Sequence, residues 1–81
     1  MLHIASAIIK TRRLEQEAVR AAIAAMPGAD IVAAEAGRVV VVLEADHSPA
    51  ISDMLDQVAA LQGVLSATLV FEHAEPEEDP I

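Results

Sequence analysis

Three histidines, His3, His47 and His73, carry the side chains best suited to acid–base catalysis or metal binding. They are spread along the chain, and none is paired with another at the short spacing that brings metal ligands together. The sequence has no cysteine, which also excludes thiolate ligands, cysteine nucleophiles and disulfides. We therefore expect no metal site and no bound cofactor.

The other candidates for catalysis also lack suitable partners. Asp53 and Asp56 lie three residues apart, on what we expect to be the solvated face of a helix rather than in a cleft. Ser48 and Ser52 have no histidine arranged as a base within the same motif. The glycines are isolated and form neither a phosphate-binding loop nor a dinucleotide fingerprint. We expect no catalytic residues and interpret the chain as a binding protein, not an enzyme.

The composition narrows the class of partner. The 81 residues make one small domain with a formal net charge of −8, and Phe71 is the only aromatic residue. Nucleic-acid binding needs aromatic stacking surfaces or clustered Lys and Arg, so we expect no nucleic-acid partner. No stretch approaches the roughly 20 apolar residues of a membrane helix, and the first residues lack a basic leader. We therefore expect a cytoplasmic protein with no membrane span.

The acidic charge is concentrated near the carboxyl end. Residues 72–81 contain five acidic residues and no Lys or Arg, and so supply −5 of the net charge. We expect a folded domain over 1–73 and a solvated, disordered tail over 74–81. The alternative is that the tail attracts a basic partner and speeds its association.

Two halves of the chain repeat one order of elements, strand then helix then strand. The hydrophobic patterns predict strands over 2–9, 29–34, 38–44 and 64–72, and helices over 13–26 and 48–62. A βαββαβ order folds most simply as one antiparallel sheet of four strands with both helices on one side. The sheet's other side is then left without cover from this chain.

Local signals place the elements. The β-branched run Val39–Leu43 predicts a central strand packed on both faces, whereas the alanine-rich 29–34 predicts an edge strand. Leu14 lies near the start of the apolar stripe of the first helix, and Ser48 is expected to cap the second. Gly37 is the natural site for positive φ in the turn between the expected strands 29–34 and 38–44.

The two-residue period of a strand assigns side chains to faces. The larger apolar set should pack against the helices, because burying one leucine-sized side chain contributes roughly 1.5–3 kcal/mol. The inward set is Ala5, Ala7, Ile9, Val39, Val41, Leu43, Ala67, Leu69 and Phe71. The outward set is Ile4, Ser6, Ile8, Val40, Val42, Glu44, Ser66, Thr68 and Val70, with Glu72 next along the same face.

The outward set is too apolar for an ordinary wetted surface. One interpretation is that a second copy covers it, sheet on sheet, in a homodimer. The other is a docking surface for a peptide, which lies across the face as an amphipathic helix or adds a strand at an edge. The residues alone leave these two interpretations equal.

Several stretches, taken together in order and spacing, resemble the NapD family. They are Ser6–Ile9, Met26–Ala29, Gly37–Ala45 and Gly63–His73. The resemblance spans nearly the whole chain and implies a ferredoxin-like α+β fold. It also implies a chaperone that binds the twin-arginine signal peptide of the periplasmic nitrate reductase precursor, NapA, and prevents its premature export by the Tat translocase. No residue is catalytic in that picture.

The resemblance places the peptide on the sheet, which is also where the residue pattern leaves a face uncovered. The candidate peptide-binding residues are therefore the nine of the outward set. Acidic residues at the margin, Glu44, Asp46 and Glu72, are expected to meet the arginines of the peptide. Such rim charges chiefly set association rate and selectivity.

Two rival functions use the same order of elements. An ACT-like regulatory module binds small ligands and dimerises through its sheet, but its glycine-marked loop is missing after the first strand, where Ile9–Arg12 contains no glycine. A metallochaperone needs Cys-x-x-Cys at that place and is excluded. We expect a monomer or a weak homodimer.

Overall fold

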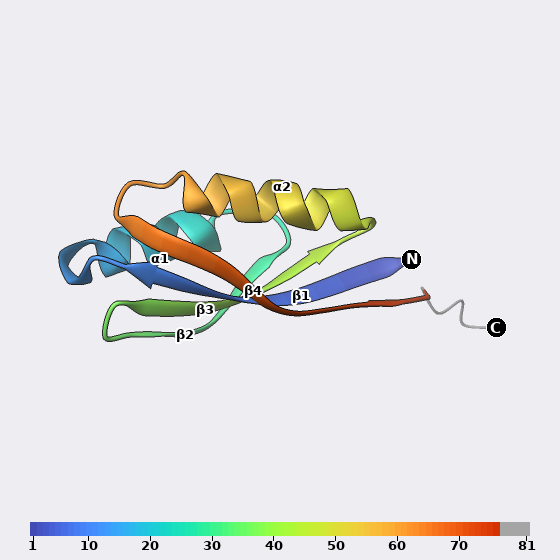
Figure 1. Cartoon of the computed structure of the whole chain (residues 1–81), viewed down its shortest axis with the longest axis horizontal. Coiled ribbons are helices and arrows are strands. Elements are labelled where there is room, and N and C mark those ends of the chain that lie inside the picture. Colours follow the sequence, from blue (N-terminus) through green and yellow to red (C-terminus); the bar gives the residue numbers. More distant parts are fainter. Residues whose placement is uncertain (77–81) are drawn as a thin grey trace.

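The computed structural model describes residues 1–76 and contains one sheet and two helices (Figure 1). The elements in chain order are β1 (Leu2–Thr11), the short 3₁₀ helix η1 (Arg13–Glu15), α1 (Gln16–Ala24), β2 (Ala29–Glu35), β3 (Arg38–Ala45), α2 (Ser48–Ala59) and β4 (Val64–Glu75). The four strands are antiparallel in the order β2-β3-β1-β4. Figure 1 shows both helices on one side of this sheet. The predicted βαββαβ, ferredoxin-like arrangement is confirmed, including the edge position of β2.

The core fills the space between the sheet and the helices. Alternate residues of β1 and β3 point into it, and each of the two helices adds a stripe of apolar residues. The fully buried members are Ala5, Ala7, Ile9, Val19, Ile23, Val39, Val41, Leu43, Ile51 and Val58. The inward residues predicted for β1 and for β3 are therefore confirmed. The alanines on β1 leave room for the helices to lie close to the sheet.

The prediction that β3 is a central strand is right, but the prediction that it is packed on both faces is wrong. β3 lies between β2 and β1, and its residues Val39, Val41 and Leu43 are fully buried. Val40 and Val42 are only half-buried, because nothing from residues 1–76 packs over their side of the sheet. A β-branched run fits a half-buried pleated surface as well as a fully buried one.

The first helix is shorter than predicted. The chain makes the 3₁₀ turn of η1 before α1 begins at Gln16, and it leaves α1 after Ala24. Leu14 lies in that turn and is 100% exposed, so the prediction that it packs at the start of the helix stripe is wrong. Gly28 follows with φ of 82°, and its carbonyl accepts a hydrogen bond of 2.8 Å from the amide of Glu44.

The second helix begins with a cap that differs from the prediction. His47 is the N-cap, and its Nδ1 accepts a hydrogen bond of 3.3 Å from the amide of Ala50. Ser48 is the first helical residue, and its hydroxyl donates to the carboxylate of Glu72 at 2.9 Å. Ser48 therefore ties α2 to β4 instead of capping α2.

The β2–β3 hairpin is anchored to the end of β1. Ala36 and Gly37 both have positive φ, 54° and 76°, as a tight turn between twisted strands requires. The Gly37 carbonyl accepts a hydrogen bond from the Thr11 amide at 2.8 Å, and the Gly37 amide donates to Oε1 of Gln16 at 2.6 Å. This end of the sheet is thus held by β1 and α1 together.

A shift of register in β4 overturns two face assignments. Ala7 pairs with Leu69 but Ser6 pairs with Phe71, so Val70 is an extra residue in β4. Because one extra residue reverses the alternation, Phe71 lies on the face without helices and Glu72 lies on the helix side, opposite Ala5. The prediction that Phe71 is inward and Glu72 outward is therefore wrong.

β4 continues to Glu75, beyond residue 72 where we expected the last strand to end. The disordered tail expected over 74–81 is wrong for residues 74 and 75, which belong to β4, and from residue 77 onward it lies outside the described residues and stays a prediction. Neither α1 nor α2, the two α-helices within residues 1–76, is long and apolar enough to cross a membrane.

Candidate functional site

The side of the sheet that faces away from α1 and α2 is the candidate site, and we call it the open face. Register places four rows of side chains across it. In order along β1 they are Glu44, Ile4 and His73; Asp30, Val42, Ser6 and Phe71; Ala33, Val40, Ile8 and Thr68; and Glu35, Arg38, Lys10 and Ser66. Each strand therefore contributes to one continuous surface.

The middle of the open face is apolar. Ile4, Ile8, Val40 and Val42 are half-buried by their neighbours, and Phe71 is 57% exposed. Ser6 and Thr68 add small hydroxyl side chains between them. Val70, the extra residue of β4, is 58% exposed at the margin. No helix from residues 1–76 covers this surface, so within the described part of the chain its apolar side chains are open to a bound molecule.

The predicted binding residues fall mostly on this face. Register brings together the eight members of the outward set other than Val70, which sits at the irregularity. Asp46 follows β3 directly and is exposed at the same end as Glu44. Glu72 does not belong to the open face, because its carboxylate lies on the helix side within 3.6 Å of His3 Nδ1 and accepts the Ser48 hydroxyl.

The structure adds residues that the sequence reasoning missed. Phe71 joins the apolar middle, Asp30 and Glu75 join the acidic margin, and Lys10 and Arg38 form the opposite margin. We predicted no role for Lys10 or Arg38 from the strand period. If the first strand is extended past residue 9, the same period places Lys10 on the face of Ile8. Nothing in the sequence indicates the shift that turns Phe71 outward.

Charge divides the open face into two ends. We call Asp30, Glu44 and Glu75 the acidic end, where Glu75 lies opposite Leu2 in the row beyond Ile4. We call Lys10 and Arg38 the basic end, where Glu35 is the neighbouring acid. All six of these side chains are exposed, and the structure records no ion pair for Asp30, Glu44, Lys10 or Arg38 with another residue of 1–76.

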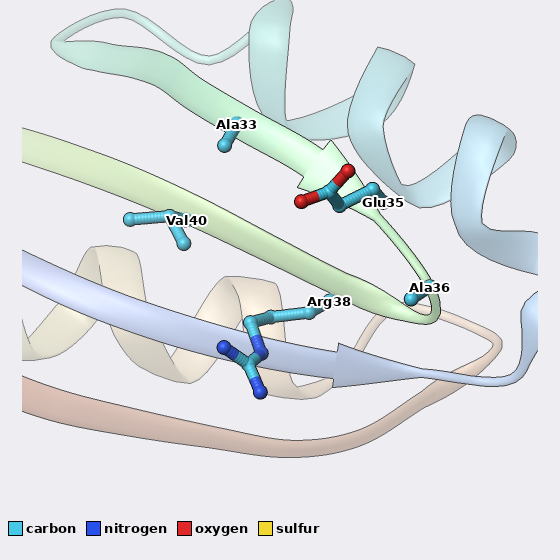
Figure 2. Close-up of a pocket in the computed structure, with 5 residues that line it drawn as sticks. All are labelled: Ala33, Glu35, Ala36, Arg38 and Val40. Carbon is cyan, nitrogen blue, oxygen red and sulfur yellow. The ribbon is translucent and has the colours of Figure 1, made fainter.

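A shallow pocket lies at the basic end. Ala33, Glu35, Ala36, Arg38 and Val40 line it, and Figure 2 shows all five on the side of the sheet away from the helices. The Arg38 side chain extends from β3 toward β1, away from Glu35. The guanidinium therefore stays free to donate hydrogen bonds to a bound molecule.

The two edges of the sheet are irregular. Val32 is an extra residue in β2, because Ile31 pairs with Val41 and Ala33 with Val40. β4 has a second shift between the partners of Lys10 and Thr11, in addition to the one at Val70. Such bulges interrupt the ladder of hydrogen bonds that an added strand would need. The open face is thus a better docking surface than either edge.

The remaining polar contacts, one on the open face and one on α1, have structural explanations. His73 on β4 contacts Glu75 at 3.4 Å and packs its ring 5.4 Å from that of Phe71. Glu17 and Arg20 pair on α1, on the other side of the sheet, and the hydrogen bond from Arg20 lowers the pKa of Glu17. Within residues 1–76, no group of three or more His, Asp or Glu side chains is arranged to hold a metal ion.

Comparisons with known proteins by sequence and by fold agree with one another. The family model described as NapD protein matches residues 2–76. The chaperone NapD of Paracoccus pantotrophus is 32% identical over 78 residues, which cover 96% of this chain and 70% of that protein. The fold matches the solution structure of the E. coli Tat proofreading chaperone protein NapD with a TM-score of 0.82, at 22% identity, over 98% of this chain and 84% of that one.

Proposed function

The chain belongs to the NapD family, and from this premise we propose that it is a cytoplasmic chaperone that binds the twin-arginine signal peptide of the periplasmic nitrate reductase precursor. Binding would hold this precursor of the catalytic subunit back from the Tat translocase until the subunit is mature. The protein performs no catalytic step in this role. Family membership sets aside the ACT-like alternative.

The observation that carries the proposal is the apolar middle of the open face. A twin-arginine signal peptide has a basic segment followed by an apolar one, and an apolar segment needs an apolar surface to leave water. Ile4, Ile8, Val40, Val42 and Phe71 supply that surface across three neighbouring strands. The carboxylates at its margin supply charge of the sign that a basic segment requires.

The length of the open face favours a helical peptide. Glu44 and Arg38 are six residues apart on β3, which corresponds to about 20 Å along a strand. A helix of about 13 residues has the same length, within the 7–15 residues typical of the apolar region of a signal peptide. An extended peptide would cover the same distance with about six residues and leave half of its apolar region in water. The interrupted edges of β2 and β4 argue against an added strand.

A charged residue in the middle of the open face tests the proposal. We expect Val42→Asp to lower the affinity for a synthetic twin-arginine signal peptide at least tenfold, because the new carboxylate must be desolvated beneath the apolar segment. Isothermal titration calorimetry measures the affinity, and circular dichroism shows that the variant is folded.

Leu14→Asp is the matched control. It also replaces an apolar residue with Asp, but at a fully exposed position in η1 outside the open face, so the affinity should stay within twofold of the parent. Equal affinity of the parent and of Val42→Asp would remove the open face as the binding site. A stable dimer whose mass does not change on adding peptide would show that a second copy occupies the face instead.

A further inference from the structure

The charges on the open face are arranged along the strands, not scattered. The acidic end lies at the start of β1, and the basic end lies where β1 finishes. The loops continue this division: Asp46 follows β3 at the acidic end, while Arg12 and Arg13 follow β1 at the basic end, and all three are exposed. Glu44 and Arg38, at opposite ends of the face, are about 20 Å apart along β3.

We propose that the bound signal peptide lies in one direction only, with its arginine pair over the acidic end and its carboxyl-terminal part over the basic end. The peptide then runs in the same direction as β1. This inference rests on the proposed function and adds the direction, which neither the family nor the apolar surface determines.

The acidic end offers the arginine pair several carboxylates, whereas the basic end offers one beside two cations. Asp30 and Glu44 are exposed, and the structure records no ion pair for either within residues 1–76, so both remain free to accept the bidentate hydrogen bonds that guanidinium groups form with carboxylates. The reverse direction would place two arginines beside Lys10 and Arg38, with Glu35 as the sole acid of that row. Like charges brought together at an interface oppose that arrangement.

The basic end suits the other end of a helical peptide. The last turn of a helix has carbonyl groups without intrahelical partners and carries a partial negative charge. Arg38 extends across the surface toward β1 in Figure 2, and Lys10 is its partner in the ladder. These two cations are therefore placed to donate hydrogen bonds to the final carbonyls. Both ends of the peptide favour the same direction.

Site-directed spin labelling of the peptide tests the direction. The chain has no cysteine, so a nitroxide is attached to a cysteine of the synthetic twin-arginine peptide, either just before the arginine pair or just after the apolar segment. Broadening of amide resonances is measured in the ¹⁵N-labelled full chain. The first label should broaden Ile4, Glu44 and His73 most, and the second should broaden Lys10, Arg38 and Ser66 most.

Two glutamates on the same face provide a matched pair of variants. Glu44→Gln should weaken binding of the unlabelled peptide about two- to fivefold, the range measured for exposed ion pairs. Glu35→Gln removes the same charge from the basic end and should leave the affinity equal or slightly higher.

The outcomes separate the two proposals. If the second label broadens the acidic end most, or both labels broaden both ends equally, the direction is overturned while binding to the open face stands. An effect of Glu35→Gln as large as that of Glu44→Gln also overturns the direction. If neither labelled peptide binds, the proposed function itself fails.

Discussion

Ala36 shows how one residue is held in an unfavourable backbone conformation. It has a φ of 54° in the β2–β3 turn, where a side chain with a Cβ atom costs roughly 1–2 kcal/mol. The turn keeps this conformation because Gly37 is bonded to both Thr11 and Gln16. The geometry of the hairpin therefore comes from its anchors as well as from its own sequence.

Replacing Ala36 with a residue that favours positive φ should stabilise the protein. We expect Ala36→Asn to raise the free energy of unfolding by about 0.5–1 kcal/mol, since Asn followed by Gly is preferred in such turns. Urea denaturation measures the change. Ala33→Asn, on the same surface but at an ordinary φ, should give no gain, and an equal gain there would show that the turn conformation is not the cause.

At the scale of single residues, the sequence predicts where a helix begins better than it predicts which side chains bond to each other. The start of α2 at Ser48 is as predicted, but the cap is His47 instead of Ser48, whose hydroxyl bonds to Glu72. That partner comes from β4, twenty-four residues away, and no local pattern indicates it. Glu72 was wrongly assigned to the margin of the binding face, because the extra residue Val70 turns it to the helix side.

At the scale of elements, β4 shows where strand periodicity fails. The pattern correctly placed Leu69 on the helix side, but the extra residue Val70 turns the following Phe71 to the open face. A bulge follows from how β4 pairs with β1, which the residues of β4 do not encode by themselves. The rows built from β1 and β3 needed no such correction and were predictable from alternation alone.

The bulge leads to opposite expectations for two neighbouring residues. Phe71→Ala should change the free energy of unfolding by less than about 0.5 kcal/mol but lower peptide affinity about fivefold, because Phe71 is exposed on the open face. Leu69→Ala should cost about 1–2 kcal/mol of stability and leave affinity unchanged, since Leu69 is 40% exposed on the helix side.

Urea denaturation and calorimetry on the same two variants measure both quantities. If instead Phe71→Ala destabilised the protein more than Leu69→Ala, Phe71 would pack against the helices in solution. The register shift at Val70 would then be wrong.

At the scale of the whole molecule, net charge should govern how fast the peptide arrives. The chain carries −8 and the peptide is basic, so their attraction acts before contact and is screened by salt. We expect the association rate constant to fall about tenfold between low salt and about 1 M salt, where the screening length is about 3 Å. Dissociation, which depends on the apolar contacts, should change much less.

Stopped-flow fluorescence with a labelled peptide measures both rates. Glu44→Gln should reduce the salt dependence of the association rate slightly, and the rate should still fall as salt is added. An association rate that does not vary with salt would show that electrostatic attraction plays no part in recognition.

The pairing of Leu2 with Glu75 has a practical consequence for anyone who modifies this protein. β1 begins and β4 ends at the acidic end of the sheet. A purification tag or fluorescent fusion joined before Leu2 or after Glu75 therefore emerges beside the carboxylates. A polyhistidine or lysine-rich linker there would compete with a cationic ligand and mimic weak affinity. Tag-free material, or attachment through the exposed Leu14 position, keeps that approach clear.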